Sequence, residues 1–452
     1  PGHIMTSPIQ TLTDYATGLA FNDIPDVAVA RAKACLADTV AVGVYGARFP
    51  WSQIIMQYAL QSGRDGRCTL FGAAEQLSPP LAALANGALA HAFELDNLRQ
   101  PGAGVHPGAT VAVPALAMAQ ETGASGKDLI TALVAGCEVM FRIGLASKHT
   151  SEKLGFHAPG LTGVYGGAIA AGKLLGLNTE QMTHAMGIAG SLSSGLLEFS
   201  KSGSGGMVKR LHLGRAAEGG ILAASLAQGG FDGPASVLDG PFGFLNVFCA
   251  ETDPDALTAG LGERYETLRI CLKRYACHVT AQAPVQSTRA LMTKYEFSGD
   301  DVDSMTIHCS DKVLSHHNIP DPGDLMLLQY SVPYCVALAL HRDPDDPDNF
   351  NDEARADPAI RDTVSRITLA PHEAPQTGAW ASTIKIFLHD GRSVVRVADN
   401  FKGSAETPLS DSELAAKFLR LTAPEMGRDA AESLCERLAH LETQDDISNL
   451  FE

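Results

Sequence analysis

Residues 160–175, with the sequence GLTGVYGGAIAAGKLL, decide the fold class of this chain. Apolar residues recur here every three or four positions, as they do on one face of an α-helix. Glycine and alanine fill most of the remaining positions, which indicates helices that pack closely, backbone to backbone. Polar residues interrupt the segment, so a buried helix of a globular protein is favoured over a membrane-spanning helix.

The same helical pattern extends outward over about residues 8–261. Ser125 and Asn178 stand directly before two of the periodic segments, where a side-chain oxygen can cap the first turn of a helix. We expect further helices over residues 27–44, 79–93 and 126–143.

The pattern changes near residue 268. Met305, Ile307 and Cys309 alternate with other residues, as in a β-strand with one buried face, and Asp390-Gly391 is a strong hairpin signal. Further strands are expected over residues 364–369, 383–388 and 393–398, and helices over 283–295 and 325–340. We predict a mainly α protein, with a large all-helical domain built from both chain ends (1–267 and 399–452) and a smaller α+β lid domain (268–398).

The chain has 452 residues, and 34 Lys and Arg against 51 Asp and Glu give a net charge of −17. Nucleic acids and anionic membranes bind basic faces, so we expect neither as a partner. An anionic substrate would need a local basic pocket that overcomes this overall charge.

The nine cysteines are scattered, and no Cys-x-x-Cys pair occurs, which favours reduced thiols over a disulfide framework. Residues 1–5 lack the basic start and apolar centre of a signal peptide, and no run of about 18 apolar residues suggests a transmembrane helix. We expect a cytoplasmic protein.

Residues 91–108 hold the first group of candidate functional residues. A helix is expected to end here in a loop rich in glycine and proline, and such loops often carry functional groups. The alternative is a helix end with ordinary solvated charges. The side chains that the loop presents are Glu94, Asp96, Asn97, Arg99 and His106.

His157 is a second candidate because it stands just before a helix that begins near Pro159. The positive end of a helix dipole favours a neutral imidazole, and a neutral imidazole suits a general base. An isolated histidine in this position is more often a capping or turn residue.

Two basic segments complete the candidates. Lys209, Arg210 and Arg215 follow a Gly/Ser-rich loop that is not a P-loop, and this cluster would suit one or more carboxylates. Lys273 and His278 lie where the domain character changes, and they could bind a carboxylate and carry a proton, or form a solvated linker.

Tyr334 opens an apolar helix, where a tyrosine usually belongs to the core or its rim but could also protonate an enolate. No His-Glu-x-x-His motif occurs, the adjacent His316 and His317 make poor metal ligands, and no dinucleotide-binding fingerprint follows a strand. We expect no metal and no cofactor.

Taken together, these segments resemble the family of 2-methylcitrate dehydratase and cis-aconitate decarboxylase (MmgE/PrpD) over almost the whole chain. Each segment is moderately specific, and their order and spacing are specific. The segments are residues 86–107, 135–144, 156–157, 163–177, 209–217, 273–278 and 331–334.

The resemblance implies a homodimer of two-domain subunits, each with a helical domain and a smaller α+β lid. It also implies a pocket at the domain junction for small di- or tricarboxylates. The residues that fall on the family's pocket positions are His106, His157, Lys209, Lys273, His278 and Tyr334.

One difference from the family concerns the first loop, where the dehydratases and decarboxylases usually carry Asp-Phe-Asp-Asp-Thr. This chain has Glu94-Leu-Asp96-Asn97-Leu98, so one acid has become an amide and the threonine hydroxyl is missing. The family also includes iminodisuccinate epimerase, which removes and replaces a proton next to a carboxylate. We therefore predict an epimerase of this type, acting without a cofactor on a small dicarboxylate or amino-dicarboxylate.

Two alternatives remain. One is a lyase of the 2-methylcitrate dehydratase or cis-aconitate decarboxylase type, and the other is a non-enzymatic helical binding or scaffold protein. For the enzyme, Tyr165 joins the candidates because it follows His157 by eight residues, near the same helix start. The expected proton-transfer residues are His106, His157, Tyr165, Lys209, His278 and Tyr334, and the expected substrate-binding residues are Glu94, Asp96, Arg99, Arg210 and Lys273.

Overall fold

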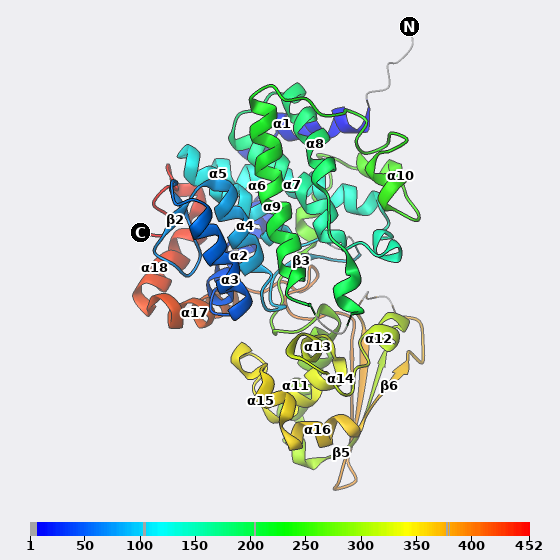
Figure 1. Cartoon of the computed structure of the whole chain (residues 1–452). Helices are drawn as coiled ribbons and strands as arrows, with labels where there is room; N and C mark the ends of the chain where they lie inside the picture. The colour runs from blue at the N-terminus through cyan, green and yellow to red at the C-terminus, as the bar shows by residue number, and fades with distance from the viewer. Residues whose placement is uncertain (1–6, 103–104, 203–204, 377, 379) are drawn as a thin grey trace. The chain divides into compact units, whose positions relative to one another are not determined.

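The computed structural model describes residues 7–102, 105–202, 205–376, 378 and 380–452. It divides into two compact units. The first combines the described residues up to Ala92 with those of Asp96–Cys271 and with Asp411–Glu452, and the second combines Phe93–Leu95 with the described residues of Leu272–Ser410. Figure 1 shows the elements of both units.

The first unit is built mainly from helices. They are α1 (Pro8–Gly18), α2 (Asp26–Gly46), α3 (Pro50–Ser62), α4 (Pro79–Ala90), α5 (Val113–Thr122), α6 (Gly126–Ala146), α7 (Ala158–Leu174), α8 (Thr179–Leu192), α9 (Val208–Gln228), α10 (Phe244–Phe248), α17 (Asp411–Met426) and α18 (Arg428–Ala439). Two short antiparallel strand pairs accompany them, β1 (Cys68–Thr69) with β2 (Gln76–Leu77) and β3 (Leu98–Arg99) with β4 (Ile270–Cys271). These two-residue strands are small additions to a unit that is helical, as the sequence predicts.

Helix α7 contains the segment that decides the fold, and it packs against α6 and α9 in the centre of the first unit (Figure 1). A Cβ atom added to Gly220 of α9 would lie 2.5 Å from the carbonyl carbon of Gly167 in α7. A Cβ added to Gly136 of α6 would lie 2.7 Å from the carbonyl oxygen of Gly166. Real Cβ atoms do not approach this closely, so the small residues allow the backbone-to-backbone packing predicted from the sequence.

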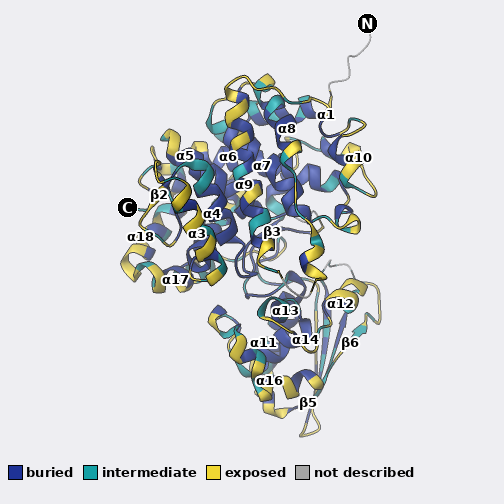
Figure 2. Cartoon of the chain, in the orientation of Figure 1, coloured by how far each residue is buried: buried dark blue, intermediate teal, exposed yellow. Residues whose placement is uncertain are grey.

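Helix α6 is the one described helix that is long and apolar enough to cross a membrane, by length and composition only. Of its most apolar window, 94% is buried inside the protein, as in the core helix of a globular domain. Its charged residues Glu138 and Arg142 form a fully buried ion pair at 2.6 Å. Figure 2 shows the buried centre of this unit in dark blue.

The C-terminal helices return to the N-terminal part of the chain. Both α17 and α18 pack against α2, and Lys417 of α17 pairs with the buried carboxylate of Asp38 in α2 at 2.5 Å. The first unit is therefore assembled from both ends of the chain.

The second unit contains a four-stranded sheet in the order β6-β5-β7-β8. The β5–β6 pair is parallel and the other two pairs are antiparallel. Helix α11 packs against β7 and β8, and α14 packs against β6. The elements are α11 (Val279–Tyr295), β5 (Val302–Cys309), α12 (Asp311–His316), α13 (Leu325–Tyr330), α14 (Val332–His341), α15 (Asp352–Ala356), α16 (Pro358–Ser365), β6 (Ile367–Pro371), β7 (Ser382–Leu388) and β8 (Ser393–Ala398).

Two sequence predictions for this unit need correction. The strand expected over 364–369 begins only at Ile367, because Val364 belongs to α16. The helix expected over 325–340 is two helices, since Ser331 is extended and caps α14 by accepting a hydrogen bond from the Tyr334 amide. Pro333 has no N–H to donate to the Gln329 carbonyl, so one helix cannot run unbroken through this point, whereas a proline is tolerated in the first turn of α14.

The compact units also divide the chain at other positions than the sequence analysis expected. They change between Cys271 and Leu272 and between Ser410 and Asp411, and the short segment Phe93–Leu95 belongs to the second unit. Three residues inside a loop carry no periodic signal, so their assignment depends on tertiary contacts alone.

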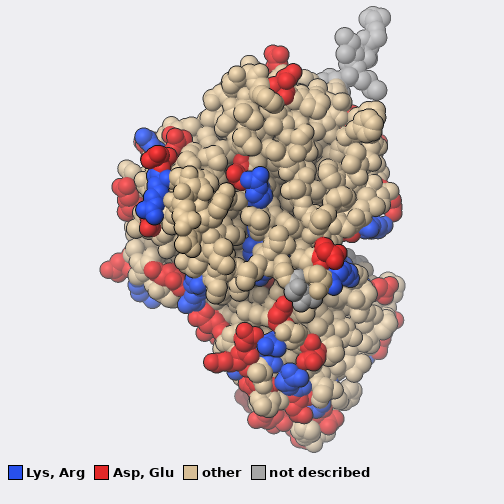
Figure 3. Space-filling view, viewed as in Figure 1, with Lys and Arg blue, Asp and Glu red and all other residues tan. Residues whose placement is uncertain are grey.

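Charged side chains are scattered over the face drawn in Figure 3. On this face of the described chain, Lys and Arg lie in small groups mixed with Asp and Glu, without one continuous basic patch. This agrees with the excess of acidic residues in the sequence.

Candidate active site

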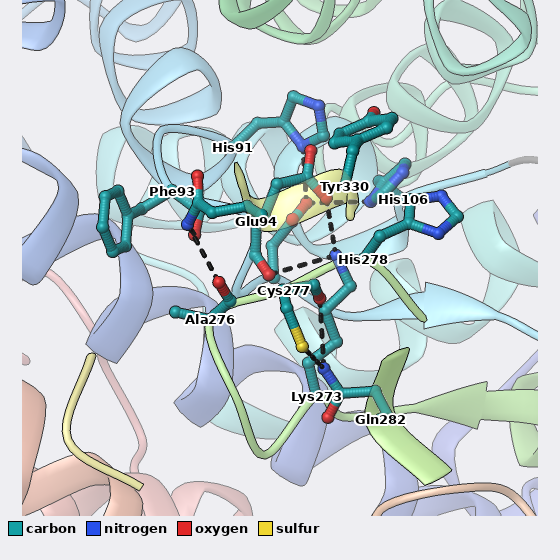
Figure 4. A network of polar contacts seen from close by, with 12 residues as sticks. His91, Phe93, Glu94, His106, Lys273, Ala276, Cys277, His278, Gln282 and Tyr330 are labelled. Atoms are coloured by element: carbon teal, nitrogen blue, oxygen red, sulfur yellow. Dashed lines mark hydrogen bonds and ion pairs between the residues drawn. The ribbon is translucent and has the colours of Figure 1, made fainter. Parts of the chain in front are cut away.

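Four histidines lie together in the first unit, and we call them the histidine cluster. His91 caps the C-terminal end of α4, His106 precedes the π-helical turn Gly108–Ala112, His157 precedes α7, and His212 lies in α9. The ring centroids of His91 and His106 are 4.7 Å apart, those of His91 and His157 are 6.3 Å apart, and those of His157 and His212 are 5.2 Å apart. Figure 4 shows His91 and His106 at close range.

Asp96 joins two members of the histidine cluster. Its Oδ2 lies 2.9 Å from Nδ1 of His91 and 2.8 Å from Nδ1 of His106. Burial opposes ionisation of Asp96, but the two imidazoles beside it hold the pKa of its carboxyl well below the usual range. Asp96 was expected to bind substrate, and the structure shows that one of its oxygens already serves two histidines.

Asn97 holds the loop that carries Asp96 and His106. Its Oδ1 accepts a hydrogen bond from the Gly108 amide at 2.8 Å. Its Nδ2 donates to Asp38 Oδ2 at 3.0 Å and to Thr39 Oγ1 at 3.1 Å. The amide that replaces the family's usual acid is fully buried against α2, so this difference from the family pattern concerns the support of the loop.

The main influence on the charge of His157 is burial, whereas the helix end was the influence considered from the sequence. Burial of its ring, followed by the neighbouring His212, lowers the pKa of His157 to about 3. Its Nδ1 lies 3.0 Å from Nδ1 of His212, so one ring donates the proton and the other accepts it. Burial and the charge of Lys209 also lower the pKa of His212.

These lowered pKa values predict that the protein loses stability in acid. Between about pH 6.5 and pH 3 the unfolded chain binds a proton at His157 that the folded protein does not bind, so stability falls as pH falls through this range. His157→Gln should reduce the dependence of the unfolding free energy on pH by up to about 1.4 kcal/mol per pH unit near pH 5. Urea denaturation of both proteins at several pH values from pH 7 to pH 4 measures this dependence.

His440→Gln is the matched control for this prediction, because His440 is exposed in the same unit. The unfolding free energy of this variant should depend on pH as steeply as that of the unchanged protein. Equal slopes for the His157 variant and the unchanged protein would contradict the buried neutral state of His157.

Lys209 and Arg210 begin α9 close to the histidine cluster. Lys209 is buried, with 4% of its surface exposed, and its charge helps to lower the pKa values of His91 and His212. The Arg210 guanidinium donates to the Gly206 carbonyl at 2.7 Å and lies 4.9 Å from the centre of the Trp51 ring. Lys209 therefore brings a positive charge to the cluster, whereas Arg210 anchors the start of α9.

The second unit holds a separate group of candidate residues. Lys273 is buried, and its ammonium group contacts Glu94 Oε2 at 3.1 Å and the Glu94 carbonyl at 3.3 Å (Figure 4). Glu94 adopts a positive φ of 52°, which is uncommon for a residue other than glycine. Both residues were expected to bind substrate, and the structure pairs them with each other.

His278 begins α11 and caps it, because its Nδ1 accepts a hydrogen bond from the Thr280 amide at 3.4 Å. A backbone N–H only donates, so a neutral His278 carries its proton on Nε2. The ring stacks on His317 at a centroid distance of 4.2 Å and lies 4.8 Å from Tyr330. Burial lowers the pKa of His317 to about 4.

The side chain of Gln282 fixes the segment between Lys273 and His278. Its Nε2 donates to the carbonyls of Tyr275 and Cys277 at 2.9 and 3.1 Å, and its Oε1 accepts from the amides of Arg274 and Tyr275 at 3.1 Å each. Figure 4 shows Gln282 against Cys277. This segment is thus ordered by α11 and is not the solvated linker that was the alternative.

Arg99 was expected to bind substrate, and in the structure its guanidinium makes other contacts. Its guanidinium forms an ion pair with the buried Glu266 and donates to the Pro101 carbonyl. The backbone amides of Glu266 and Thr267 in turn donate to Glu138 of α6 at 3.1 and 2.8 Å. Arg99 therefore supports the fold of its loop.

Tyr165 and Tyr334 were expected to transfer protons, and the structure assigns both to packing. Tyr165 has 1% of its surface exposed, and its ring contacts Phe244 edge-on at 5.7 Å. It lies two helical turns beyond His157, about 12 Å along the axis. Tyr334 is fully buried in the second unit, and its hydroxyl donates to the carbonyls of Ala354 and Arg355.

Replacing either tyrosine with phenylalanine should therefore change turnover by less than threefold. Tyr334→Phe should lower the free energy of unfolding by about 1–3 kcal/mol, because the carbonyls of Ala354 and Arg355 lose this donor. Steady-state kinetics and urea denaturation of both variants test this assignment. A loss of turnover above 100-fold in a folded variant would mean that this tyrosine takes part in the reaction.

His91, Asp96 and His106 could also hold a metal ion. Their ligand atoms all lie within 4.8 Å of one another, and two histidines with one carboxylate are a common ligand set for divalent transition metals. The sequence contains no metal motif at these positions, so this arrangement was not expected. The hydrogen bonds from both Nδ1 atoms to Asp96 account for the same geometry without a metal.

His91, His212 and His317 were not among the candidate residues named from the sequence, whereas Tyr330 stands in the segment 330–334 that was singled out. His91 stands at a helix end, at the start of the loop 91–108 that was singled out, so its position in the sequence could have marked it as a candidate. His212 lies three residues after Lys209, hence on the same helix face, which was a usable signal too. His317 and Tyr330 are brought to His278 by packing alone.

Comparison with known proteins found two domains of one protein family in this chain. The N-terminal domain of the MmgE/PrpD family matches residues 10–257, and its C-terminal domain matches residues 275–442. A cis-aconitate decarboxylase from Aspergillus terreus is 30% identical, over 97% of this chain and 94% of the fungal protein.

Animal proteins with the same name are similar as well. The cis-aconitate decarboxylases of Mus musculus and Homo sapiens are each 27% identical, over 99% and 96% of this chain and 93% and 91% of their own lengths. With both family domains present in order and a relative at 30% identity over nearly its full length, this chain belongs to the MmgE/PrpD family.

Proposed function

We propose that this chain is a lyase that removes carbon dioxide from a small tricarboxylate of the cis-aconitate type. The similarity to several cis-aconitate decarboxylases, over more than nine-tenths of both chains, favours this activity over the epimerase expected from the sequence. The observation that carries the proposal is the histidine cluster, in which Asp96 holds His106 next to neutral histidines and the buried Lys209.

Decarboxylation requires that a proton be added to a carbon atom of the substrate after carbon dioxide has left. Breaking the bond between a carbon and its carboxylate releases carbon dioxide and leaves the electron pair on the substrate, where a second carboxylate can delocalise it. A group in hydrogen-bond reach must then protonate carbon. Protonated His106 can give this proton from Nε2, while the Asp96 carboxylate beside Nδ1 stabilises the charged ring and keeps its orientation.

Lys209 is suited to binding a carboxylate of the substrate. Its ammonium group is buried beside imidazoles whose pKa values lie below the usual range, so the local charge is positive although the whole chain is acidic. An ammonium group in a site of low polarity attracts an anion more strongly than it does in water.

Incubation with cis-aconitate in deuterated water tests the proposal. Proton NMR should show consumption of cis-aconitate and a five-carbon dicarboxylic acid that carries one deuterium on carbon, and headspace analysis should show one carbon dioxide per turnover. Loss of water from 2-methylcitrate without carbon dioxide would instead indicate a dehydratase. The absence of reaction with cis-aconitate would contradict the proposal.

Iminodisuccinate epimerase remains a second candidate because of one observation. Leu98 stands where the decarboxylases and dehydratases usually carry threonine, and it pairs with Cys271 in a short strand. An epimerase needs no hydroxyl at this position. Entry of deuterium next to a carboxylate of iminodisuccinate, with interconversion of its isomers and no carbon dioxide, would support this candidate.

A further inference from the structure

His157 and His212 face each other with the same ring nitrogen. Their Nδ1 atoms are 3.0 Å apart, and burial lowers the pKa of both rings, so both are neutral at neutral pH. A neutral imidazole has one N–H group, and only one of the two facing nitrogens can supply it to the hydrogen bond. The ring that accepts therefore has its own hydrogen on Nε2. The two histidines are thus opposite tautomers.

The surrounding chain holds the two rings in this arrangement. A Cβ atom added to Gly195 would lie 3.1 Å from Nδ1 of His212, which is tighter than most real Cβ contacts. The carbonyl of Gly195 accepts a hydrogen bond from the His157 amide at 3.0 Å. The ring of Phe199 contacts both imidazoles edge-on, at centroid distances of 5.5 Å to His157 and 5.8 Å to His212. The fold therefore sets the distance between the two Nδ1 atoms.

Nε2 of His157 is left for another partner. The residue is 6% exposed, and its Nε2 makes no hydrogen bond with another described residue. Most buried polar atoms in folded proteins have a hydrogen-bond partner, so this nitrogen is suited to a bound ligand. The positive charge of Lys209 acts on the neighbouring His212, which favours an anion as that ligand. A carboxylate oxygen only accepts, so it binds Nε2 only where Nε2 bears the hydrogen.

We propose that His212 is a positioning residue that donates its Nδ1 hydrogen to Nδ1 of His157, so that neutral His157 presents an Nε2–H group to a carboxylate of the substrate. The inference rests on the proposed function in so far as the ligand is a carboxylate. With the opposite tautomers, the lone pair of His157 Nε2 would face the carboxylate and repel it. His212 thus acts on substrate binding through His157.

The experiment compares three replacements of His212. His212→Leu removes the donor. His212→Asn places an amide N–H group where Nδ1 stands and can still donate to His157, whereas His212→Gln places the same group one bond further out. The Asn and Gln variants form the matched pair if the leucine variant does not fold, and circular dichroism checks folding.

Two measurements are made on the full-length protein and on each variant. The first locates the ring hydrogens by NMR of protein labelled with ¹⁵N-histidine at about pH 8, where both rings are neutral. The signals of His157 are assigned by their absence from His157→Gln, and the spectra are repeated with added citrate, a tricarboxylate that binds without turnover. The second measurement is KM and kcat on cis-aconitate. If cis-aconitate is not consumed, the proposed function fails, whereas the NMR result still decides the role of His212.

In the unchanged protein, the hydrogen of His157 should be on Nε2 and that of His212 on Nδ1, and citrate should shift the Nε2 signal of His157. His212→Leu and His212→Gln should raise KM by about 5- to 10-fold with kcat changed less than about twofold, because the loss concerns binding. His212→Asn should keep KM within about twofold of the unchanged protein.

Four results would overturn the proposal. One is a hydrogen on Nδ1 of His157 in the unchanged protein, and another is an Nε2 signal that citrate does not shift. The third is an unchanged KM in folded His212→Leu or His212→Gln, since a pair that only fills space affects stability alone. The fourth is an equal KM in the Asn and Gln variants.

Discussion

Replacing His106 with alanine is expected to lower kcat by about 10²- to 10⁴-fold while leaving the fold intact, because the group that protonates carbon is lost. The side chain of His106 is 14% exposed, so the space that its removal leaves reaches solvent and can be filled by water. Asp96 keeps its other donor, His91, and remains supported. The measurement is carbon dioxide release from cis-aconitate under saturating conditions, with circular dichroism as the check on folding.

His106→Asn separates proton transfer from positioning. The asparagine amide can donate to Asp96 and to the Asn97 carbonyl as Nδ1 does now, but it has no titrating group in the place of Nε2. We expect it to be as inactive as the alanine variant. His440→Ala, an exposed histidine of the same unit, should keep activity within twofold. A folded His106→Asn variant with more than a third of normal kcat would exclude His106 as the donor.

The sequence predicted the helical unit well because its signals are local. Periodicity and small residues located α2, α6 and α7, and the caps Ser125 and Asn178 both accept the expected amide hydrogen bonds. The Asp390-Gly391 turn likewise lies between β7 and β8, with Gly391 at a φ of 88°. The extended residue Ser331, which divides the helix expected over 325–340, was less visible, because apolar residues stand on both sides of it.

The candidate site was predicted less completely, because contacts between distant segments decide it. Tyr165 and Arg99 stand near functional segments in the sequence, yet one faces the core and the other pairs with Glu266. The hydrogen bond between the rings of His157 and His212 joins residues that are 55 positions apart in the sequence. Residue type and spacing could mark these segments, but not the partner of each side chain.

The role of Asn97 was the least predictable from the sequence. The loss of an acid from the family pattern suggested a change of activity. In the structure the Asn97 amide donates to Asp38, Thr39 and the Cys35 carbonyl, all within α2. A carboxylate there would meet the carboxylate of Asp38, so the amide fits a neighbour that no motif includes.

Asn97→Asp should therefore destabilise the protein strongly, by about 3–5 kcal/mol at pH 8. One carboxylate oxygen can still accept from the Gly108 amide, but the other would replace Nδ2 at 3.0 Å from Asp38 Oδ2. Burial already raises the pKa of Asp38, against the lowering effect of Lys417, so a second buried negative charge can be accommodated only by taking up a proton. The shift in the urea denaturation midpoint measures the effect.

The pH dependence of Asn97→Asp gives the sharper test. Two carboxylates this close repel each other, which raises the pKa of the pair in the folded state. A proton bound between them stabilises the folded variant, and this stability is present at low pH and is lost as pH rises. The variant should thus be closer to the unchanged protein at pH 5.5 than at pH 8. Asn97→Ala, which loses the hydrogen bonds without adding charge, should show no such difference.

Asp38→Asn combined with Asn97→Asp returns the pair to one carboxylate and one amide, and it should recover more than half of the loss. If Asn97→Asp were as stable as the unchanged protein at pH 8, Asn97 would not face Asp38, and the missing acid would again be a candidate cause of altered activity.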